Sequence, residues 1–384
     1  MSRIIVLGAG VLGASTAYHL ARAGADVTVL EAAGPASGTS SATFSIDVTH
    51  LKTPHDYYLL NRQGSDGHLA LAAELEGLPW RHPAPLVQWS DTDEGHQALR
   101  ERALRVREWG HTCEFAPATA LRDLAPAADP ASCTADEIVV HERAAWYDAP
   151  RFVRALLDGA ARLGATVHYG VRATGLLRSA EGRVTGVRAG ERTWTADKVV
   201  NCAGPYADRI AALADTRLPM ERIPGLVGES TPVPEAGLGA ILAAPGVDLR
   251  PAPDARVVSI SWPVDALLAD GTTDLTSLAA DLHGRGEKVL PALTAARSAG
   301  ARVGLRPVPL DGLPLAGELP SAPGLYHLVS HSAVNLAPAL GRLAARELTT
   351  GTPTPELSPY RPDRATDSPV RDESLQVMSG HAAR

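Results

Sequence analysis

Residues 3–31 read RIIVLGAGVLGASTAYHLARAGADVTVLE and decide how the rest of the chain is interpreted. The segment 3–7 is short, apolar and rich in β-branched side chains, which predicts a buried strand. Three glycines follow it with GxGxxG spacing: Gly8, Gly10 and Gly13. Apolar residues then recur at helical spacing over 14–23, and a second apolar run, 27–30, ends at Glu31. The stretch therefore predicts a β–α–β unit.

Each of these glycines, the start of the helix and Glu31 would have a separate physical role in binding a dinucleotide. Gly8 permits the tight turn out of the strand, Gly10 lets the backbone approach a pyrophosphate, and Gly13 lets the helix pack on the sheet. The start of the helix offers free N–H groups to the phosphates. Glu31 is placed to accept hydrogen bonds from a ribose hydroxyl, and its charge argues against a 2′-phosphate and so against NADP. The strand–glycine–helix context is what the motif requires.

Composition narrows the class of protein further. At 384 residues the chain exceeds the usual single core, so we expect two domains. The net charge of −7 and the lack of a basic run argue against nucleic-acid binding. Three cysteines without CxxC spacing argue against a metal site and for reduced thiols, which favours a cytoplasmic location. We recognise no signal peptide and no apolar run long enough to span a membrane.

Further segments suggest how the chain returns to the nucleotide. The small-residue loop after Glu31 contains Ser40 and Ser41, which could contact the pyrophosphate as a second loop or form only a flexible surface segment. Strands alternate with turns over 165–201, and VVNCAGPYAD at 199–208 has the form of a second βα unit. The tail, 353–384, is rich in Pro, Asp, Arg and Ser, so we expect it to be flexible.

Four stretches together resemble one enzyme family. They are GxGxxG with Glu31, VVNCAGPYAD at 199–208, GLRPVPLDGLPLAG at 304–317, and GLYHLVSHSAVNLAPALGRLAARELTTG at 324–351. Their order is similar to that of the FAD-dependent D-amino-acid oxidase, glycine oxidase and sarcosine oxidase family, and most of all to its glycine-oxidase-like branch. The resemblance is specific for the flavin half and vague for 46–149 and 217–300.

The resemblance implies an α/β fold in which a Rossmann-like FAD-binding domain is interleaved with an α+β substrate domain built on an antiparallel sheet. The expected bounds are 1–50, 145–216 and 302–352 for the FAD-binding domain, and 51–144 and 217–301 for the substrate domain. It also implies FAD held without a covalent bond, because no His lies in GTSSATF and no Cys lies near GLRP. The residues that we expect to contact the cofactor are Gly8, Gly10, Val11, Leu12, Gly13, Glu31, Ser40, Ser41, Val171, Ala203, Gly204, Arg306, Ala333, Val334, Asn335 and Leu336.

The same resemblance suggests catalytic residues. Arg306 of GLRP corresponds to an arginine that binds a substrate carboxylate, since a guanidinium matches a carboxylate bidentately. The alternative is a structural arginine paired with Asp311. His50 and Lys52 lie near where relatives place polar residues close to the flavin, although a solvated loop is the other interpretation. The last helix, expected near Asn335 with a proline in its first turn, would direct its N-terminus at the flavin C2 carbonyl.

The function implied is oxidation of an amino acid or N-alkyl amino acid. Hydride passes from the amine-bearing carbon to flavin N5, the imine hydrolyses, and O2 is reduced to H2O2. The alternative is a dehydrogenase of the same fold that passes electrons to a carrier. Two further alternatives are an NAD-linked reductase and a flavin-bound structural or sensory protein. The expected partners are a small amine or amino acid and O2, with no nucleic acid, membrane or metal, and homo-oligomer formation stays open.

Overall fold

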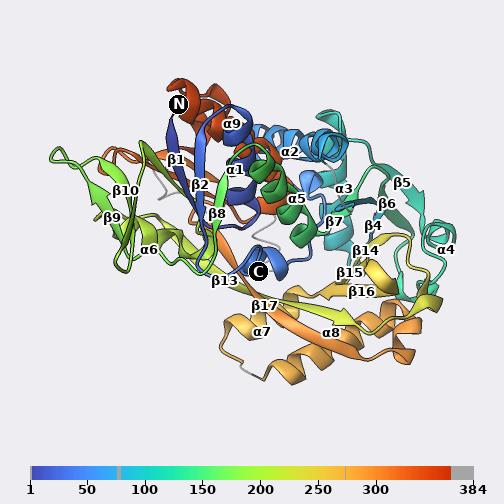
Figure 1. Ribbon diagram of the computed structural model, residues 1–384. Coiled ribbons are helices and arrows are strands. Elements are labelled where there is room, and N and C mark those ends of the chain that lie inside the picture. Colours follow the sequence, from blue (N-terminus) through green and yellow to red (C-terminus); the bar gives the residue numbers. More distant parts are fainter. Residues whose placement is uncertain (1, 76–78, 273, 365–384) are drawn as a thin grey trace.

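The computed structural model describes residues 2–75, 79–272 and 274–364 (Figure 1). The predicted β–α–β unit is present as β1 (Arg3–Leu7), α1 (Val11–Arg22) and β2 (Asp26–Leu30). The strands β1 and β2 pair in parallel, as a right-handed β–α–β connection requires. The helix begins at Val11, directly after Gly10, and so starts three residues before the expected segment.

The first unit belongs to a six-stranded sheet with the order β18–β19–β12–β1–β2–β8. Five of its strands run in parallel, and β18 pairs with β19 in the antiparallel sense. The remaining strands of this sheet are β8 (Thr166–His168), β12 (Lys198–Asn201), β18 (Leu315–Glu318) and β19 (Leu325–Val329). Strands separated by more than a hundred residues therefore lie side by side, which agrees with the predicted discontinuous Rossmann-like arrangement.

Two different layers flank the six-stranded sheet. Helices α1, α2 (His55–Glu74), α5 (Ala149–Arg162) and α9 (Ala333–Thr350) share one apolar core with its strands, and Figure 1 shows them grouped together. A three-stranded antiparallel sheet packs on the other face through a second apolar core, which includes Ile5 of β1, Val199 of β12 and Val187 of the small sheet. Its strands are β9 (Gly175–Arg178), β10 (Val184–Ala189) and β11 (Arg192–Thr195). The sheet is thus covered on both faces, as parallel sheets require.

The second half of the molecule is built on an eight-stranded sheet with the order β17–β13–β16–β15–β14–β4–β6–β5. All its neighbours are antiparallel except β14 and β4. The bounds are β4 (Leu86–Gln88), β5 (Glu114–Pro117), β6 (Glu137–His141), β13 (Met220–Ser230), β14 (Ile241–Ala244), β15 (Val247–Ala252), β16 (Arg256–Ile260) and β17 (Ser298–Pro309). The expected antiparallel substrate sheet is therefore present.

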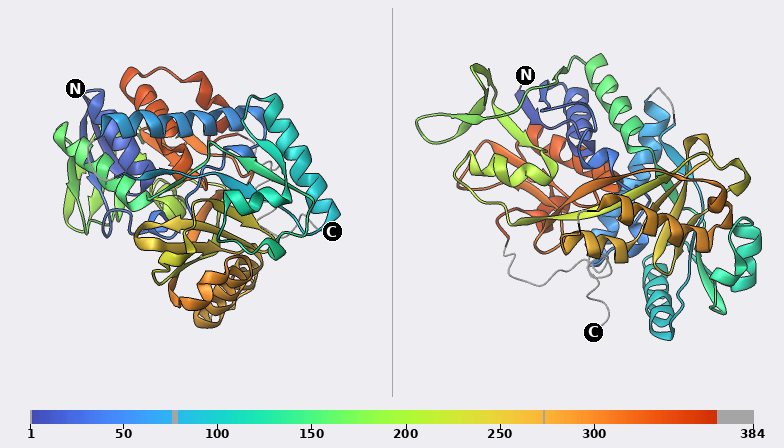
Figure 2. Two further views of the ribbon diagram at one scale, coloured as in Figure 1. Left: turned by 90° about the vertical axis from the view of Figure 1, so that its right-hand side faces the viewer. Right: turned by 90° about the horizontal axis from the view of Figure 1, so that it is seen from below.

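Helices and a small sheet complete this half. Figure 2 shows α7 (Trp262–Ala269) and α8 (Leu275–Val289), in orange, as a layer on the outer side of the eight-stranded sheet. The other elements are the two-stranded sheet of β3 (Arg81–Pro83) and β7 (Ala145–Tyr147), and the helices α3 (Asp93–Glu108) and α4 (Leu121–Leu124). The long strands β13 and β17 pair over most of their length and run between the two halves (Figure 1).

The division into domains stays a proposal. Helix α2 falls in the segment assigned to the substrate domain, yet it packs on α9 and contributes Tyr57, Leu60 and Leu71 to the core of the nucleotide half. Within the described part of the chain, no helix is long and apolar enough to cross a membrane.

The expectation of a flexible tail is wrong for the part of it that the structure describes. Residues 353–364 are not a flexible tail: Leu357 and Tyr360 are buried, and Arg361 pairs with Glu347 of α9. Arg364 binds Asp311 through two nitrogens at 2.7 and 2.8 Å. Buried aromatic area and paired charges therefore hold this segment although its composition resembles a linker. Residues 365–384 of the expected tail lie outside the described residues.

Candidate functional site

The first part of the site is the turn between β1 and α1. Gly8 has φ +104°, and a Cβ there would lie 2.5 Å from the Cys202 carbonyl oxygen. A Cβ on Gly13 would lie 1.9 Å from the Gly8 carbonyl oxygen, so only glycine fits at either position. At Gly10 the nearest atom to a Cβ would be Ser40 Oγ at 3.1 Å. The glycines thus pack the helix closely on the sheet and leave the approach to Gly10 lined by a hydroxyl.

Ser40 is brought to the start of α1 by the loop that follows β2. The Val11 N–H donates to Ser40 Oγ at 3.2 Å, and α1 has no side-chain cap of its own. The N–H groups of Val11, Leu12 and Gly13 precede the first helical hydrogen bond, which Ala14 N makes to Gly10. The Ser41 hydroxyl has a different partner, since its Oγ donates to the Gly38 carbonyl at 3.1 Å.

Glu31 stands at the end of β2, beside the glycine turn. Its two carboxylate oxygens accept from the N–H groups of Ala9, at 2.7 Å, and Ala33, at 2.8 Å. Each oxygen retains a lone pair, because a carboxylate oxygen accepts about two hydrogen bonds. The carboxylate is therefore fixed in direction and still able to accept from a ribose hydroxyl.

Other expected cofactor residues lie at the same edge of the six-stranded sheet. Val171 follows β8, and its N–H donates to the Glu31 carbonyl at 2.8 Å. Ala203 and Gly204 follow β12, and the neighbouring Cys202 N–H donates to Leu7 at 2.9 Å. Because the carboxyl ends of parallel strands meet at one edge, these backbone segments surround the start of α1.

The start of α9 is a second helix terminus without a side-chain cap. The helix begins at Ala333, and its first four residues are the expected set Ala333, Val334, Asn335 and Leu336. Leu336 N donates to Ser332, so the preceding three N–H groups have no acceptor within the helix. Pro338 is the sixth residue and not part of the first turn, so the expected reason for its tolerance is wrong.

Arg306 lies on β17, at the junction with the nucleotide half. Its partner across the sheet is Ile223, and a Cβ on nearby Gly304 would lie 2.2 Å from the Ala42 carbonyl oxygen. The loop after β2 therefore crosses β17 two residues from Arg306, and Thr39 Oγ1 donates to Leu305 at 2.6 Å. This contact places the guanidinium close to the loop that carries Ser40.

The carboxylate paired with Arg306 is Asp265 of α7, which the sequence did not indicate. Arg306 Nη2 lies 2.7 Å from Asp265 Oδ2, and the other oxygen accepts from Leu226 N at 2.6 Å. Asp311, the partner considered in the structural alternative, binds Arg364. Trp262, the first residue of α7, lies with its ring centroid 5.0 Å from the guanidinium carbon. Burial raises the pKa of Asp265, and the adjacent guanidinium opposes that rise.

His50 and Lys52 are buried, so the solvated-loop interpretation is wrong for both. Their exposed fractions are 3% and 2%. The His50 ring lies 4.3 Å from that of His141, and burial, then His141 and His111, hold its pKa well below the usual value. Lys52 Nζ lies 5.4 Å from the centroid of the Tyr57 ring. Their catalytic role stays a prediction. The described residues contain no group of three His, Cys, Asp or Glu suited to a metal ion.

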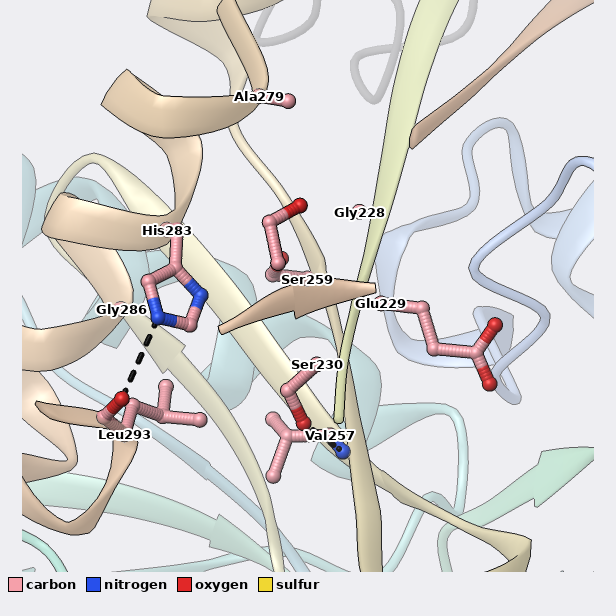
Figure 3. Close-up of a pocket in the computed structure, with 10 residues that line it drawn as sticks. Gly228, Glu229, Ser230, Val257, Ser259, Ala279, His283, Gly286 and Leu293 are labelled. Carbon is pink, nitrogen blue, oxygen red and sulfur yellow. Dashed lines mark hydrogen bonds between the residues drawn. The ribbon is translucent and has the colours of Figure 1, made fainter. Parts of the chain in front are cut away.

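Two cavities lie away from this constellation. One of ≈ 10 Å³, room for a single water, is lined by Gly228, Ser259 and His283 beneath α8 (Figure 3). Gly228 is five positions from Ile223, the residue paired with Arg306, and successive residues of a strand face opposite ways, so this cavity is on the sheet face opposite Arg306. The other, of ≈ 220 Å³, is lined by Lys198 and Arg361. Lys198 begins β12, so this cavity lies at the sheet edge opposite the glycine turn.

Comparison with known proteins agrees with this arrangement. A family model described as DAO, FAD dependent oxidoreductase, matches residues 3–347. The chain belongs to this family of FAD-dependent oxidoreductases. Its match extends from β1 into α9, so it includes the glycine turn, the second βα unit, Arg306 and the start of the last helix.

Individual proteins are similar over nearly their whole length. The uncharacterized oxidoreductase YurR of Bacillus subtilis is 28% identical over 378 residues, which cover 94% of this chain and 99% of that protein. A glycine oxidase of Pseudomonas putida is 26% identical over 374 residues, 94% of this chain and 98% of that one. The crystal structure of an L-proline dehydrogenase from P. horikoshii has the same fold, with a TM-score of 0.84, 18% identity, and coverage of 96% and 99%.

The family cofactor, FAD, fits the residues present. The glycine turn leaves the pyrophosphate position free of side chains, Ser40 Oγ and the first N–H groups of α1 face it, and Glu31 is oriented beside it. These residues would hold the dinucleotide part, and the start of α9 would face the ring system.

Proposed function

We propose that this protein is an FAD-dependent oxidase of an amino acid or an N-alkyl amino acid. The observation that carries the proposal is the guanidinium of Arg306, held beside the nucleotide loop by a buried partner. Pro224 O, at 3.2 Å, and Asp265, at 2.7 Å, accept from two of its N–H groups. An arginine side chain has five N–H groups, so donors remain for a ligand carboxylate.

Asp265 supports this role because it orients the guanidinium and leaves the face that would bind a substrate carboxylate open. Its carboxylate is 4% exposed, whereas the Arg306 side chain is 18% exposed. The ion pair is therefore closed on the Asp265 side and accessible on the other. The indole ring of Trp262 restricts the guanidinium further. A bidentate, charge-assisted pair with a substrate carboxylate would fix the neighbouring amine-bearing carbon in the site.

The start of α9 would act on the cofactor ring. FAD supplies the hydride acceptor at N5 when it is bound. The three N–H groups at the start of α9 that have no acceptor within the helix, with the positive end of the helix dipole, would stabilise negative charge at flavin N1 and the C2 carbonyl. The imine product hydrolyses in water, so no protein nucleophile is required. With O2 as electron acceptor, the balance is one H2O2 for each amine oxidised.

The test is stopped-flow reduction of the flavin without O2, using glycine, sarcosine, D- and L-amino acids and N-carboxymethyl amines. Arg306→Ala should lower kcat/KM by about 10²–10³, because a buried charge pair is worth about 2–5 kcal/mol. Arg306→Lys should restore little, since an ammonium lacks the planar fork. FAD content should remain near that of the unaltered protein.

Arg302→Ala is the matched control on the same strand. Its side chain is 58% exposed and lies 3.7 Å from Glu229, so its loss should leave kcat/KM nearly unchanged. Unchanged kinetics in Arg306→Ala with a carboxylate substrate would reject the assignment. Rapid flavin reduction followed by slow reoxidation with O2, but fast reoxidation with a dye acceptor, would instead identify a dehydrogenase.

A further inference from the structure

Pro338 interrupts the hydrogen-bond ladder of α9 one turn from its start. It is the sixth residue of the helix. In an uninterrupted α-helix, the N–H of residue 338 would donate to the carbonyl of Val334. Proline has no N–H, so this carbonyl loses its helical partner. A buried carbonyl without a donor is costly, and a donor from elsewhere is needed.

His68 of α2 provides that donor. Its Nε2 lies 2.8 Å from the Val334 carbonyl oxygen, and its Nδ1 lies 3.3 Å from Trp80 Nε1. An indole N–H only donates, so Nδ1 accepts and the imidazole proton is on Nε2. The neutral tautomer therefore satisfies both contacts at once. Burial lowers the pKa of His68 to about 4, which keeps the ring uncharged at neutral pH.

The surroundings hold the His68 ring in one orientation. The side chain is fully buried, stacked on Tyr147 at 4.2 Å between ring centroids, and 4.5 Å from Phe152. Tyr147 also donates to Asn335 Oδ1 at 3.3 Å, and Asn335 Nδ2 donates to Asn61 Oδ1 at 3.1 Å. One cluster on α2 and β7 thus holds both Val334 and Asn335.

This hydrogen bond acts on a peptide group at the start of α9, where the proposed function would place the flavin ring. The Val334 carbonyl and the Asn335 N–H belong to the same peptide unit. Donation to the carbonyl polarises that unit and makes its N–H a stronger donor, as in any hydrogen-bonded chain. Asn335 N–H is one of the three at the start of α9 without a helical acceptor. The effect of His68 is therefore transmitted through a single peptide group.

We propose that His68 is a positioning residue for the flavin: its Nε2–H replaces the N–H that Pro338 lacks and sets the donor strength of Asn335 N–H toward the cofactor ring. The inference rests on the proposed function only in placing that ring at the start of α9. His68 touches neither substrate nor cofactor in this proposal, and acts through the Val334–Asn335 peptide.

The experiment uses sulfite, which adds to oxidised flavin and leaves negative charge on the ring, so its Kd reports the donors that stabilise this charge. His68→Phe keeps an aromatic ring for Tyr147 but removes the donor, and should raise the sulfite Kd of the holoenzyme at least about fivefold. His68→Gln keeps an N–H donor and should raise it less.

Pro338→Ala offers a specific rescue because it returns the missing N–H to Val334. The double variant His68→Phe/Pro338→Ala should recover a sulfite Kd within about twofold of the unaltered protein, and Pro338→Ala alone should stay within that range. The thermal midpoint of the apoprotein should follow the same order, with His68→Phe lowest. A purely structural role for His68 would lower the thermal midpoint without moving the sulfite Kd.

An unchanged sulfite Kd in His68→Phe, or a double variant that regains stability but not sulfite affinity, would overturn the inference. Failure of the proposed flavin placement has a different signature. In that case the unaltered holoenzyme would be indifferent to sulfite, while the rescue of apoprotein stability by Pro338→Ala would still be seen.

Discussion

The starts of α1 and α9 are two helix termini with the same chemistry and different origins. Neither has a side-chain cap, and each presents N–H groups without helical acceptors. The start of α1 is shaped by glycines within ten residues of one another, with Ser40 added from the next loop. The start of α9 is held by His68, Asn61 and Tyr147, which are 188 to 274 residues away in the chain. The start of α1 is predictable because a local motif shapes it. The start of α9 is not, because it depends on packing between distant segments.

The largest expected effect is at the locally encoded terminus. In Gly10→Val, a branched side chain occupies the pyrophosphate approach, so FAD affinity should fall at least about a thousandfold and the protein should purify colourless. The apoprotein should still fold, because a Cβ at Gly10 meets only Ser40 Oγ, at 3.1 Å. Absorbance of the purified protein and its thermal midpoint measure the two effects.

Gly239→Val is the control for this substitution. A Cβ at Gly239 has no described neighbour within 4 Å, so this variant should retain its yellow colour. Normal FAD content in Gly10→Val would show that the cofactor does not approach the glycine turn, and would remove the first terminus from the comparison.

Acid should lower the free energy of unfolding, and His68, which lies against α9, contributes to that loss. The folded pKa of His68 is about 4, against 6.5 for an exposed imidazole, so the unfolded chain binds the extra proton first as pH falls. The contribution is complete above pH 6.5 and is lost between 6.5 and 4, by about 3 kcal/mol in the free energy of unfolding. Chemical denaturation measured at several pH values in this range should show that the free energy of unfolding changes less with pH in His68→Gln than in the unaltered protein.

Other buried imidazoles add to the same trend, which is why the difference between the two proteins is the informative quantity. Burial lowers the pKa of His327 to about 4 and that of His141 to about 3. Identical pH slopes for the unaltered protein and His68→Gln would mean that His68 is not held neutral in the folded state.

The smallest expected effect concerns the contact between α2 and α9. A Cβ on Gly64 would lie 2.1 Å from the Asn335 carbonyl oxygen, so Gly64→Ala must push the two helices apart. Overpacking of this kind costs about 1–3 kcal/mol, and we expect a loss of about 2 kcal/mol in urea denaturation together with weaker sulfite binding. Gly284→Ala in α8, with no described neighbour within 4 Å, should instead stabilise the protein slightly. Equal stability of both variants would contradict the close α2–α9 contact.

The family, the Rossmann-like fold and FAD followed from segments whose meaning is local. GxGxxG with Glu31 and the second βα unit can be recognised from residues that are close together in the chain. The family match confirms the family, the fold and FAD that these segments predicted. The pairing of Arg306 was not predictable in this way: the sequence offered Asp311, four positions beyond GLRP, whereas the structure supplies Asp265 from α7. Nothing in the spacing of these residues indicates that pair. The binding roles of the individual residues stay predictions.

By itself, the sequence determined the β–α–β unit and the order of segments that return to it, because backbone conformation at glycines and the alternation of apolar residues are local properties. Only the tertiary structure decided which groups were buried together. It packed His50 and Lys52 away from solvent, anchored residues 353–364 through Arg361 and Arg364, and brought His68 to the Val334 carbonyl. Burial and pairing across long separations depend on how whole elements pack, since desolvation makes each polar group require a partner that chain order does not specify.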